Sequence, residues 1–126
     1  MVKGYPDWGY IQKRPNYFFT TGQLVTAAAH SFTSLLVPVG MLYEVNYAMI
    51  YFWSGVTDLI QFTHYCNADG DSYVLHKILT PVINQTYSFP LPFYITERDG
   101  IGFRVKVTTA PLDYEIRILY NEQSMS

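Results

Sequence analysis

The segment 41–53, MLYEVNYAMIYFW, is the part of the sequence that most restricts the fold. Its apolar residues recur with a period of two, which is the period of a β-strand and not of a helix. One face of that strand carries Met41, Tyr43, Val45, Tyr47, Met49, Tyr51 and Trp53. The opposite face is polar at Glu44 and becomes apolar from Ala48 onward. The segment therefore predicts a strand whose second half is covered on both sides.

Two further segments have a clear inward and outward alternation. In 103–107, FRVKV, and 113–120, DYEIRILY, apolar residues alternate with charged ones. The residues expected to face inward are Phe103, Val105, Val107, Tyr114, Ile116, Ile118 and Tyr120. The intervening TTAPL predicts a hairpin that brings Arg104 or Lys106 near Glu115.

The remaining segments indicate one all-β domain. The only short helical candidate, 22–32, has no capping box before it. Strand-like runs are separated by turn residues, including a turn at Ser54-Gly55 and the polar loop NADGD after Cys66. About eight short strands with such spacing are typical of a sandwich or barrel. We expect a single β-sandwich, jelly-roll-like, of antiparallel strands.

The first residues do not follow the strand pattern. The segment 3–19, KGYPDWGYIQKRPNYFF, is aromatic and basic, and its prolines and glycines interrupt both the helical and the strand period. We expect residues 1–20 to be an extended N-terminal arm and 21–126 to be the sandwich domain, with 16–20 already entering the first strand. The residues expected to bind a partner are Tyr5, Trp8, Tyr10, Lys13, Arg14 and Tyr17.

The composition favours association with other chains. Aromatic residues make up 17% and charged residues only 14%, whereas charged residues usually make up about 25%. Interfaces are enriched in aromatic residues and depleted in Lys and Glu, so a homo-oligomer such as a trimer or pentamer is expected. The net charge of −2 argues against a general nucleic-acid binder.

Other features limit the compartment and the chemistry. Cys66 is the single cysteine, so neither an intrachain disulfide nor a cysteine-based zinc cluster is expected. The longest apolar run, SLLVPVGMLY, is far shorter than a membrane span, which needs about 20 residues. The sequence starts without an apolar leader stretch, so no secretory signal is expected.

Candidate metal ligands are weak. Asn67, Asp69 and Asp71 alternate as in a calcium loop, but no bidentate Glu follows, and a polar Asp-Gly hairpin turn is the favoured interpretation. The chain has the histidines His30, His64 and His76, and Asp58 could orient one of them. Their spacing lacks an H-x-H motif, so a cupin-type metal centre is not favoured. We expect no metal and no cofactor. If two histidines did share a metal ion, His64 and His76 would be the best pair, because their strands could be neighbours.

Enzymatic motifs are also missing, so we expect a non-enzymatic protein. Neither a nucleophile elbow nor a phosphate-binding loop is present. Glu44, Asp58 and Glu97 could in principle converge as a carboxylate pair for glycoside cleavage, but nothing singles them out. Aromatic residues that could stack on sugars are Trp8, Tyr47, Tyr51, Trp53 and Tyr65.

Three segments resemble small β-sandwich modules of virion proteins. SLLVPVGMLYEVNYAMIYF is similar to a hydrophobic run with V-P-x-G before a long strand, although Met41 replaces the usual lysine. FPLPFYITERDGIGFRVKV is similar to the later segment with an L-P-F turn and a tip ending in D-G, and GYPDW resembles the start of phage structural proteins. The resemblance covers 4–8, 34–53 and 88–120.

This resemblance implies a structural role in a virion and carries no functional residues across. It implies a capsid decoration protein, a minor capsid protein or a spike or fibre base, located in the virion and contacting the major capsid protein or other virion proteins. A receptor- or glycan-binding module of a tail, spike or fibre is the alternative. No nucleic-acid or membrane partner is expected.

Overall fold

The computed structural model describes residues 13–89 and 92–125, which form antiparallel strands and the turns between them. The strands are β1 (Arg14–Leu24), β2 (Ala29–Leu36), β3 (Met41–Cys66), β4 (Asp71–Leu79), β5 (Gln85–Ser88), β6 (Phe93–Thr96) and β7 (Gly100–Ser124). They form one seven-stranded sheet with the central order β1-β7-β3-β4. The described residues contain no helix and therefore none of membrane-spanning length. The predicted all-β class is confirmed.

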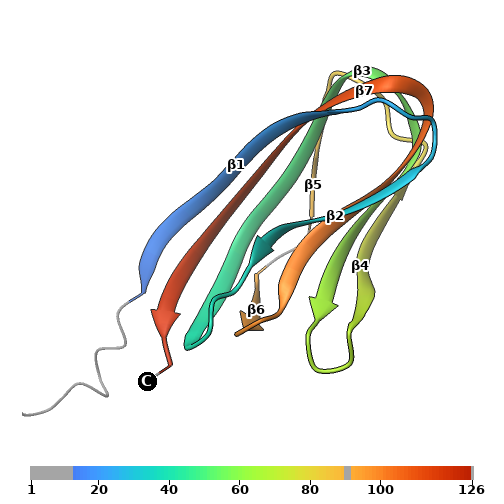
Figure 1. The fold of residues 1–126 in the computed structure, drawn as a ribbon. Helices are drawn as coiled ribbons and strands as arrows, with labels where there is room; N and C mark the ends of the chain where they lie inside the picture. Colours follow the sequence, from blue (N-terminus) through green and yellow to red (C-terminus); the bar gives the residue numbers. More distant parts are fainter. Residues whose placement is uncertain (1–12, 90–91, 126) are drawn as a thin grey trace, which may run out of the picture.

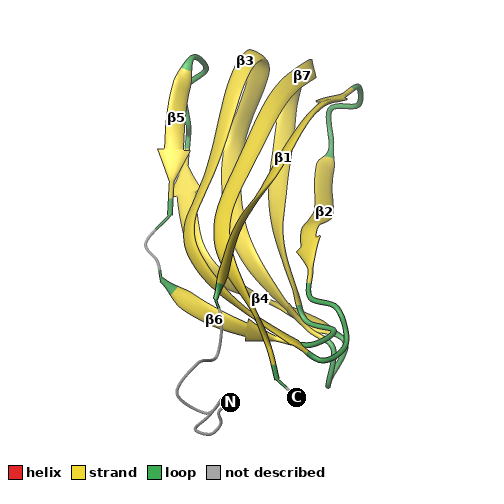
Figure 2. Cartoon of the chain, turned by 90° about the vertical axis from the view of Figure 1, so that its left-hand side faces the viewer, coloured by secondary structure: helices red, strands yellow, loops and turns green. Residues whose placement is uncertain are grey.

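The two long strands β3 and β7 run side by side and fold the sheet into two layers (Figure 1). Their ladder runs from Met41 opposite Ser124 to Tyr65 opposite Gly100, with several irregularities between Phe52 and Leu59 where both strands bend. The first layer contains β1, β5, β6, the first half of β3 and the second half of β7. The second layer contains β2, β4 and the other two halves. Figure 2 shows the same bend from the side.

The bend lies where the sequence predicted chain reversals. Gly55 has φ of +82°, and a Cβ at this position would lie 2.5 Å from the carbonyl oxygen of Pro111. Only glycine fits this backbone conformation and this close approach without strain. The hydroxyl of Thr57 lies 2.6 Å from the carbonyl oxygen of Lys106, so it satisfies a backbone acceptor where the ladder is irregular.

Two strand predictions are therefore wrong. The Ser54-Gly55 turn is a bend within continuous β3, and FRVKV and DYEIRILY are two halves of β7 rather than a hairpin. Glu115 is paired with Thr21 and Tyr51, whereas Arg104 and Lys106 are paired with Gln61 and Leu59 in the other layer. The described residues form seven strands, close to the expected number of about eight, and the sandwich-like antiparallel fold is as predicted.

The core lies between the two layers. Aromatic rings of Phe62, Phe89 and Phe103 meet there, with centroids 5.0 to 5.6 Å apart. The inward alternation of both halves of β7 is confirmed, since Phe103, Val105, Ile116 and Ile118 are fully buried. Burial of these side chains from two layers is the main term that holds the fold together.

A β-bulge changes the facing of the segment 41–53. The register of β3 shifts between Val45 and Tyr47. Val45 is buried before the bulge, whereas Ala48 and the alternate residues after it take the inward positions. Tyr47 and Trp53 consequently point outward and are 36% and 42% exposed. The prediction that both sides of the second half are covered is wrong at Tyr47 and Trp53, whereas Met49 on the same outward side is buried.

β1 begins at Arg14 and pairs with β7 along its whole length, from Arg14 opposite Glu122 to Leu24 opposite Leu112. Residues 16–20 belong to the first strand, as the sequence indicates. Residues 1–12 lie outside the described residues. The division into an arm, 1–20, and a sandwich, 21–126, stays a prediction.

Candidate interaction surface

The outer face of the first layer carries apolar side chains in neighbouring rows. The strand register places Tyr17, Leu119 and Tyr47 side by side across β1, β7 and β3. Tyr17 is 67% exposed and Leu119 is 48% exposed. We call the set Tyr17, Phe19, Tyr47, Tyr51, Trp53, Tyr94 and Leu119 the aromatic face. The charged pair Arg117 and Glu115 lies in the rows between them. Large exposed apolar side chains gathered on one face mark an interaction site more often than an ordinary solvated surface.

The aromatic face exists because 17–19 of β1 and 47–53 of β3 carry apolar residues on both sides of the strand. In β1, Phe18 points inward and packs against the core, whereas Tyr17 and Phe19 point outward. A solvated antiparallel strand normally carries polar residues at such outward positions. The outward apolar residues therefore contribute nothing to the core of this chain, and their exposure calls for another reason.

Two aromatic groups on this face have defined neighbours. The Arg117 guanidinium lies 4.7 Å from the centroid of the Phe19 ring, and its Nε donates to Glu115 Oε2 at 2.7 Å. A cation over an aromatic ring at this distance is attracted by the ring's negative face. The rings of Tyr51 and Trp53 stack with centroids 6.1 Å apart. These contacts hold the side chains in place before any partner binds.

One end of the aromatic face has a polar cluster around Glu44. The Glu44 carboxylate accepts hydrogen bonds from Asn121 Nδ2 at 3.1 Å and from the Tyr94 hydroxyl at 3.0 Å. Lys13 Nζ lies 3.3 Å from the same carboxylate. The hydrogen bonds from Asn121, Tyr94 and Lys13 lower the pKa of Glu44, and the hydrogen bond to Glu44 raises the pKa of Lys13.

The predicted partner-binding residues fall into two groups. Lys13, Arg14 and Tyr17 are described, and Lys13 and Tyr17 border or belong to the aromatic face. Arg14 is exposed and lies 3.9 Å from Glu122 Oε1. Tyr5, Trp8 and Tyr10 lie outside the described residues. The role of all six in partner binding stays a prediction.

Sequence reasoning missed Phe19 and Leu119 as surface residues, and it named Tyr47 only as a residue that could stack on a sugar. Their signal was present, because each occupies an alternate strand position next to a buried apolar residue. Apolar residues on both faces of a strand were interpreted as double burial. Only the arrangement of the layers shows that one of these faces is exposed.

The loop NADGD forms the hairpin turn between β3 and β4. Gly70 donates its backbone N–H to the carbonyl oxygen of Cys66 at 2.9 Å and has φ of +74°. The Asp69 carboxylate accepts hydrogen bonds from the Asp71 backbone and from the Tyr73 hydroxyl. The bond to Asp69 raises the pKa of Tyr73 to about 12. The Asp-Gly turn is confirmed, and Asp69 is already used within it.

The histidines have separate environments. His64 Nε2 lies 3.1 Å from Asp99 Oδ2, so Asp99 and not Asp58 contacts it. His76, on the neighbouring strand, meets the Phe89 ring edge-on, and His30 lies 2.9 Å from the carbonyl oxygen of Thr26. Among the described residues no three His, Cys, Asp or Glu side chains form a group that could hold a metal ion.

The three carboxylates considered for catalysis have different partners. Glu44 is held by the cluster described above, and Glu97 accepts the Gly40 backbone N–H at 3.2 Å. Asp58, next to the bend, lies 3.9 Å from Lys106 Nζ. No two of these carboxylates share a partner among the described residues. The arrangement gives no acid–base pair around a common substrate position.

Comparison with known proteins gives a likeness of fold. No family model matches the sequence, and the comparison with curated proteins finds no match. A protein of Bacillus endospore appendages, described as a novel family of disulfide-linked pili, is similar with a TM-score of 0.51 and 12% identity, over 91% of this chain and 92% of that one. At this identity the likeness concerns the fold alone.

A second similar structure is a chain of infectious bursal disease virus, Gx strain. Its TM-score is 0.41 at 8% identity, over 90% of this chain and 38% of that chain. A likeness at this level is too weak to support an argument about this chain.

Proposed function

We propose that this chain is a non-enzymatic structural protein of a virion, a capsid decoration protein or minor capsid component that attaches to the viral shell. The observation that carries the proposal is the aromatic face, which is exposed although it has the composition of an interface. The resemblance of segments 34–53 and 88–120 to virion modules supports the choice of partner. An all-β sandwich-like fold is compatible with this role.

The area available suits attachment. A large aromatic side chain buries roughly 150–250 Å² when it is fully covered. The exposed parts of Tyr17, Trp53 and Tyr94, together with the other members of the face, would supply a substantial share of an interface of about 800 Å² per partner. Many copies on one shell would make a modest affinity at each site sufficient.

The edge of β1 adds a second means of contact. β1 pairs with β7 on one side only, and no described strand pairs with its other side. Unpaired backbone N–H and C=O groups along such an edge can form a ladder with another chain. The edge lies next to Tyr17 and Phe19, so side-chain and backbone contacts to the shell would be adjacent.

The alternative of glycan binding has one specific observation in its favour. Trp53 is 42% exposed and stacks with Tyr51, which gives a pair of aromatic rings at the outer surface. Such rings can cover the apolar face of a sugar. Specific glycan binding that is lost in Trp53→Ala, with the fold intact, would favour this alternative over attachment to a shell.

The test removes apolar area without touching the core. In the double variant Tyr17→Ser with Leu119→Ser, we expect the protein to leave the particle fraction in sedimentation of a producing lysate, whereas the unaltered protein sediments with particles. Leu79→Ser is the matched control, because Leu79 is 65% exposed on β4, away from the aromatic face. Circular dichroism checks that each variant is folded.

Two results would count against the proposal. If the double variant sediments as the control does, the aromatic face is not the attachment surface. If the unaltered protein never sediments with particles, the structural role in a virion is wrong. A deletion that tests the predicted arm has to end at residue 12, because Arg14 already begins β1.

A further inference from the structure

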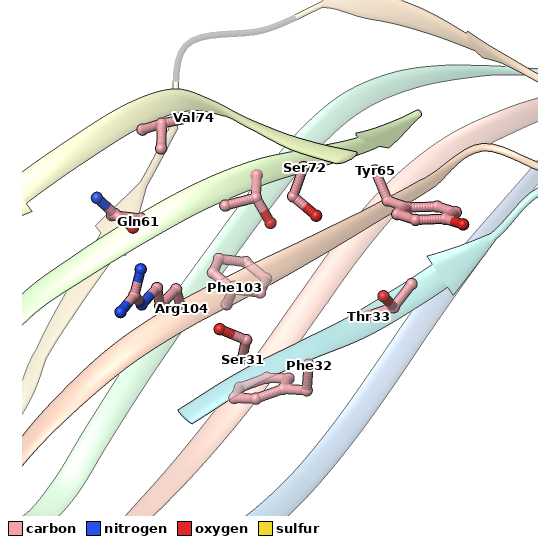
Figure 3. Close-up of a pocket in the computed structure, with 10 residues that line it drawn as sticks. Ser31, Phe32, Thr33, Gln61, Tyr65, Ser72, Val74, Phe103 and Arg104 are labelled. Atoms are coloured by element: carbon pink, nitrogen blue, oxygen red, sulfur yellow. The ribbon is translucent and has the colours of Figure 1, made fainter. Parts of the chain in front are cut away.

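The outer face of the second layer contains a hollow of about 250 Å³ (Figure 3). Its lining comes from β2, β3, β4 and β7. The polar side chains that line it include Thr33, Gln61, Thr63, Tyr65, Ser72 and Arg104. The hollow lies on the opposite layer from the aromatic face and is independent of the proposed attachment.

A glycine at the centre of the sheet creates the hollow. The register places Gly102 between Thr33 on β2 and Thr63 on β3, so this row has no side chain at its middle position. A Cβ at residue 102 would lie 2.2 Å from the carbonyl oxygen of Phe32, which no side chain tolerates. The next outward row places Arg104 between Ser31 and Gln61, so a guanidinium borders the empty position.

The polar side chains around the hollow make no side-chain hydrogen bonds or ion pairs with other described residues. The hydroxyls of Thr33, Thr63 and Ser72 make no side-chain hydrogen bond there, and neither does the Gln61 amide. Arg104 has no carboxylate within ion-pair distance among the described residues. No Asp or Glu lines the hollow. The site therefore presents several hydroxyls, one amide and one uncompensated cation in a single depression.

We propose that this hollow binds one sugar ring that carries a carboxylate. The planar guanidinium of Arg104 matches a carboxylate with two parallel hydrogen bonds. The hydroxyls of Thr33, Thr63 and Ser72 donate to and accept from the hydroxyls of the ring. The Tyr65 side chain borders the hollow and offers an apolar surface to the ring's C–H groups.

The size and charge of the site exclude larger ligands. The volume of about 250 Å³ is below the range of roughly 300–1,000 Å³ that holds drug-sized ligands, and it suits a single ring. Nucleic acid would need a basic face, but Lys106, the next outward residue of β7, has Asp58 within 3.9 Å. A bare inorganic anion would satisfy Arg104 and leave the hydroxyls unpaired.

The test is a titration of the full chain with a sugar, monitored by the backbone amide signals in heteronuclear NMR spectra. Glucuronate should shift the backbone amides of Gln61, Thr63 and Arg104 with a Kd of roughly 1 mM, as expected for a small open site. Glucose, the matched neutral sugar, should bind about tenfold more weakly or not at all, because it lacks the charged partner of Arg104. Inorganic sulfate should leave Thr63 and Ser72 unshifted.

Two variants locate the binding groups. Arg104→Gln should weaken glucuronate binding at least about tenfold and remove its advantage over glucose. Thr63→Val removes one hydroxyl at nearly constant volume and should also weaken binding. Arg117→Gln, on the opposite layer, is the matched control and should bind as the unaltered chain does. The Trp53→Ala variant should bind glucuronate as the unaltered chain does. This result would distinguish the hollow from the glycan-binding surface at Trp53 and Tyr51.

Several outcomes would overturn the proposal. The proposal is wrong if glucuronate leaves the amides of every lining residue unshifted, or if glucose binds as tightly as glucuronate. Equal shifts from sulfate and glucuronate would mean an adventitious ion only. Equal binding by Arg104→Gln and Arg117→Gln, with both spectra showing folded protein, would also contradict it.

Discussion

The two outer faces of the sandwich are built from the same two strands and yet differ in chemistry. On the first layer, β3 and β7 present Tyr47, Trp53 and Leu119. On the second layer, the same strands present Thr63, beside the hollow, and Arg104. The change occurs at the bend, where both strands turn from one layer to the other. One pair of strands can therefore supply two surfaces for two kinds of partner.

The contrast extends to how the cations are held. Arg117, on the first layer, lies over the Phe19 ring and is paired with Glu115. Arg104, on the second layer, has no such partner among the described residues. A cation with its partners in place contributes to a fixed surface, whereas an unpaired one is available to a ligand. This difference agrees with the two proposals, attachment at one face and ligand binding at the other.

The largest expected loss of stability comes from straining the bend that both faces share. Gly55→Ala places a Cβ 2.5 Å from the Pro111 carbonyl oxygen at a φ of +82°. We expect a loss of about 2–4 kcal/mol in the free energy of unfolding, measured by urea denaturation.

Gly40→Ala is the matched control for this loss. Gly40 also has φ of +82°, but a Cβ there meets nothing within 4 Å. Its cost should be only about 1 kcal/mol, from the backbone conformation. Equal losses in the two variants would show that the close approach at the bend is unimportant.

A smaller effect separates the two arginines. Arg117→Gln removes the cation over Phe19 and should lower the free energy of unfolding by about 0.5–1 kcal/mol. Arg104→Gln, without a described partner, should change it by less than about 0.5 kcal/mol. Thermal unfolding of both variants in the same buffer makes the comparison. Similar losses of unfolding free energy in the two variants would contradict the distinction between the paired guanidinium of Arg117 and the unpaired one of Arg104.

The smallest effect concerns Glu44 and depends on pH. Its pKa is lowered in the folded state, so the unfolded chain binds more protons as the pH falls. The stabilisation is fully present above the unfolded pKa of about 4.3 and is lost as the pH drops through the folded pKa. Glu44→Gln should therefore reduce the decrease in Tm that acidification causes. An identical decrease in both proteins would rule out this contribution.

The sequence predicted the local alternation well, because strand facing depends on neighbouring residues. Phe103 and Ile116 were assigned inward and are buried. The bend was misinterpreted, because a glycine such as Gly55 fits both a chain reversal and a bend in a continuous strand. Which of these occurs depends on the pairing of β3 with β7, which is not local information.

The candidate surfaces could be predicted only in part. Tyr17 was named from the aromatic opening segment, whereas Leu119 joins the same row only through pairing across about a hundred residues. Glu44 and Asn121 meet for the same reason. The hollow depends on Gly102 lying opposite two threonines, a coincidence of register that a single strand does not reveal.

The pairing of β1 also has a consequence for synthesis on the ribosome. Arg14 pairs with Glu122, and β2 likewise pairs with β7, the last of the described strands to leave the exit tunnel. Until β7 emerges, β1 and β2 lack their described backbone partner. During this time Tyr17 and Phe19 on β1 are exposed as well. Contacts so distant in sequence form slowly. In crowded polysomes, nascent copies would therefore be open to pairing with one another before each chain is complete.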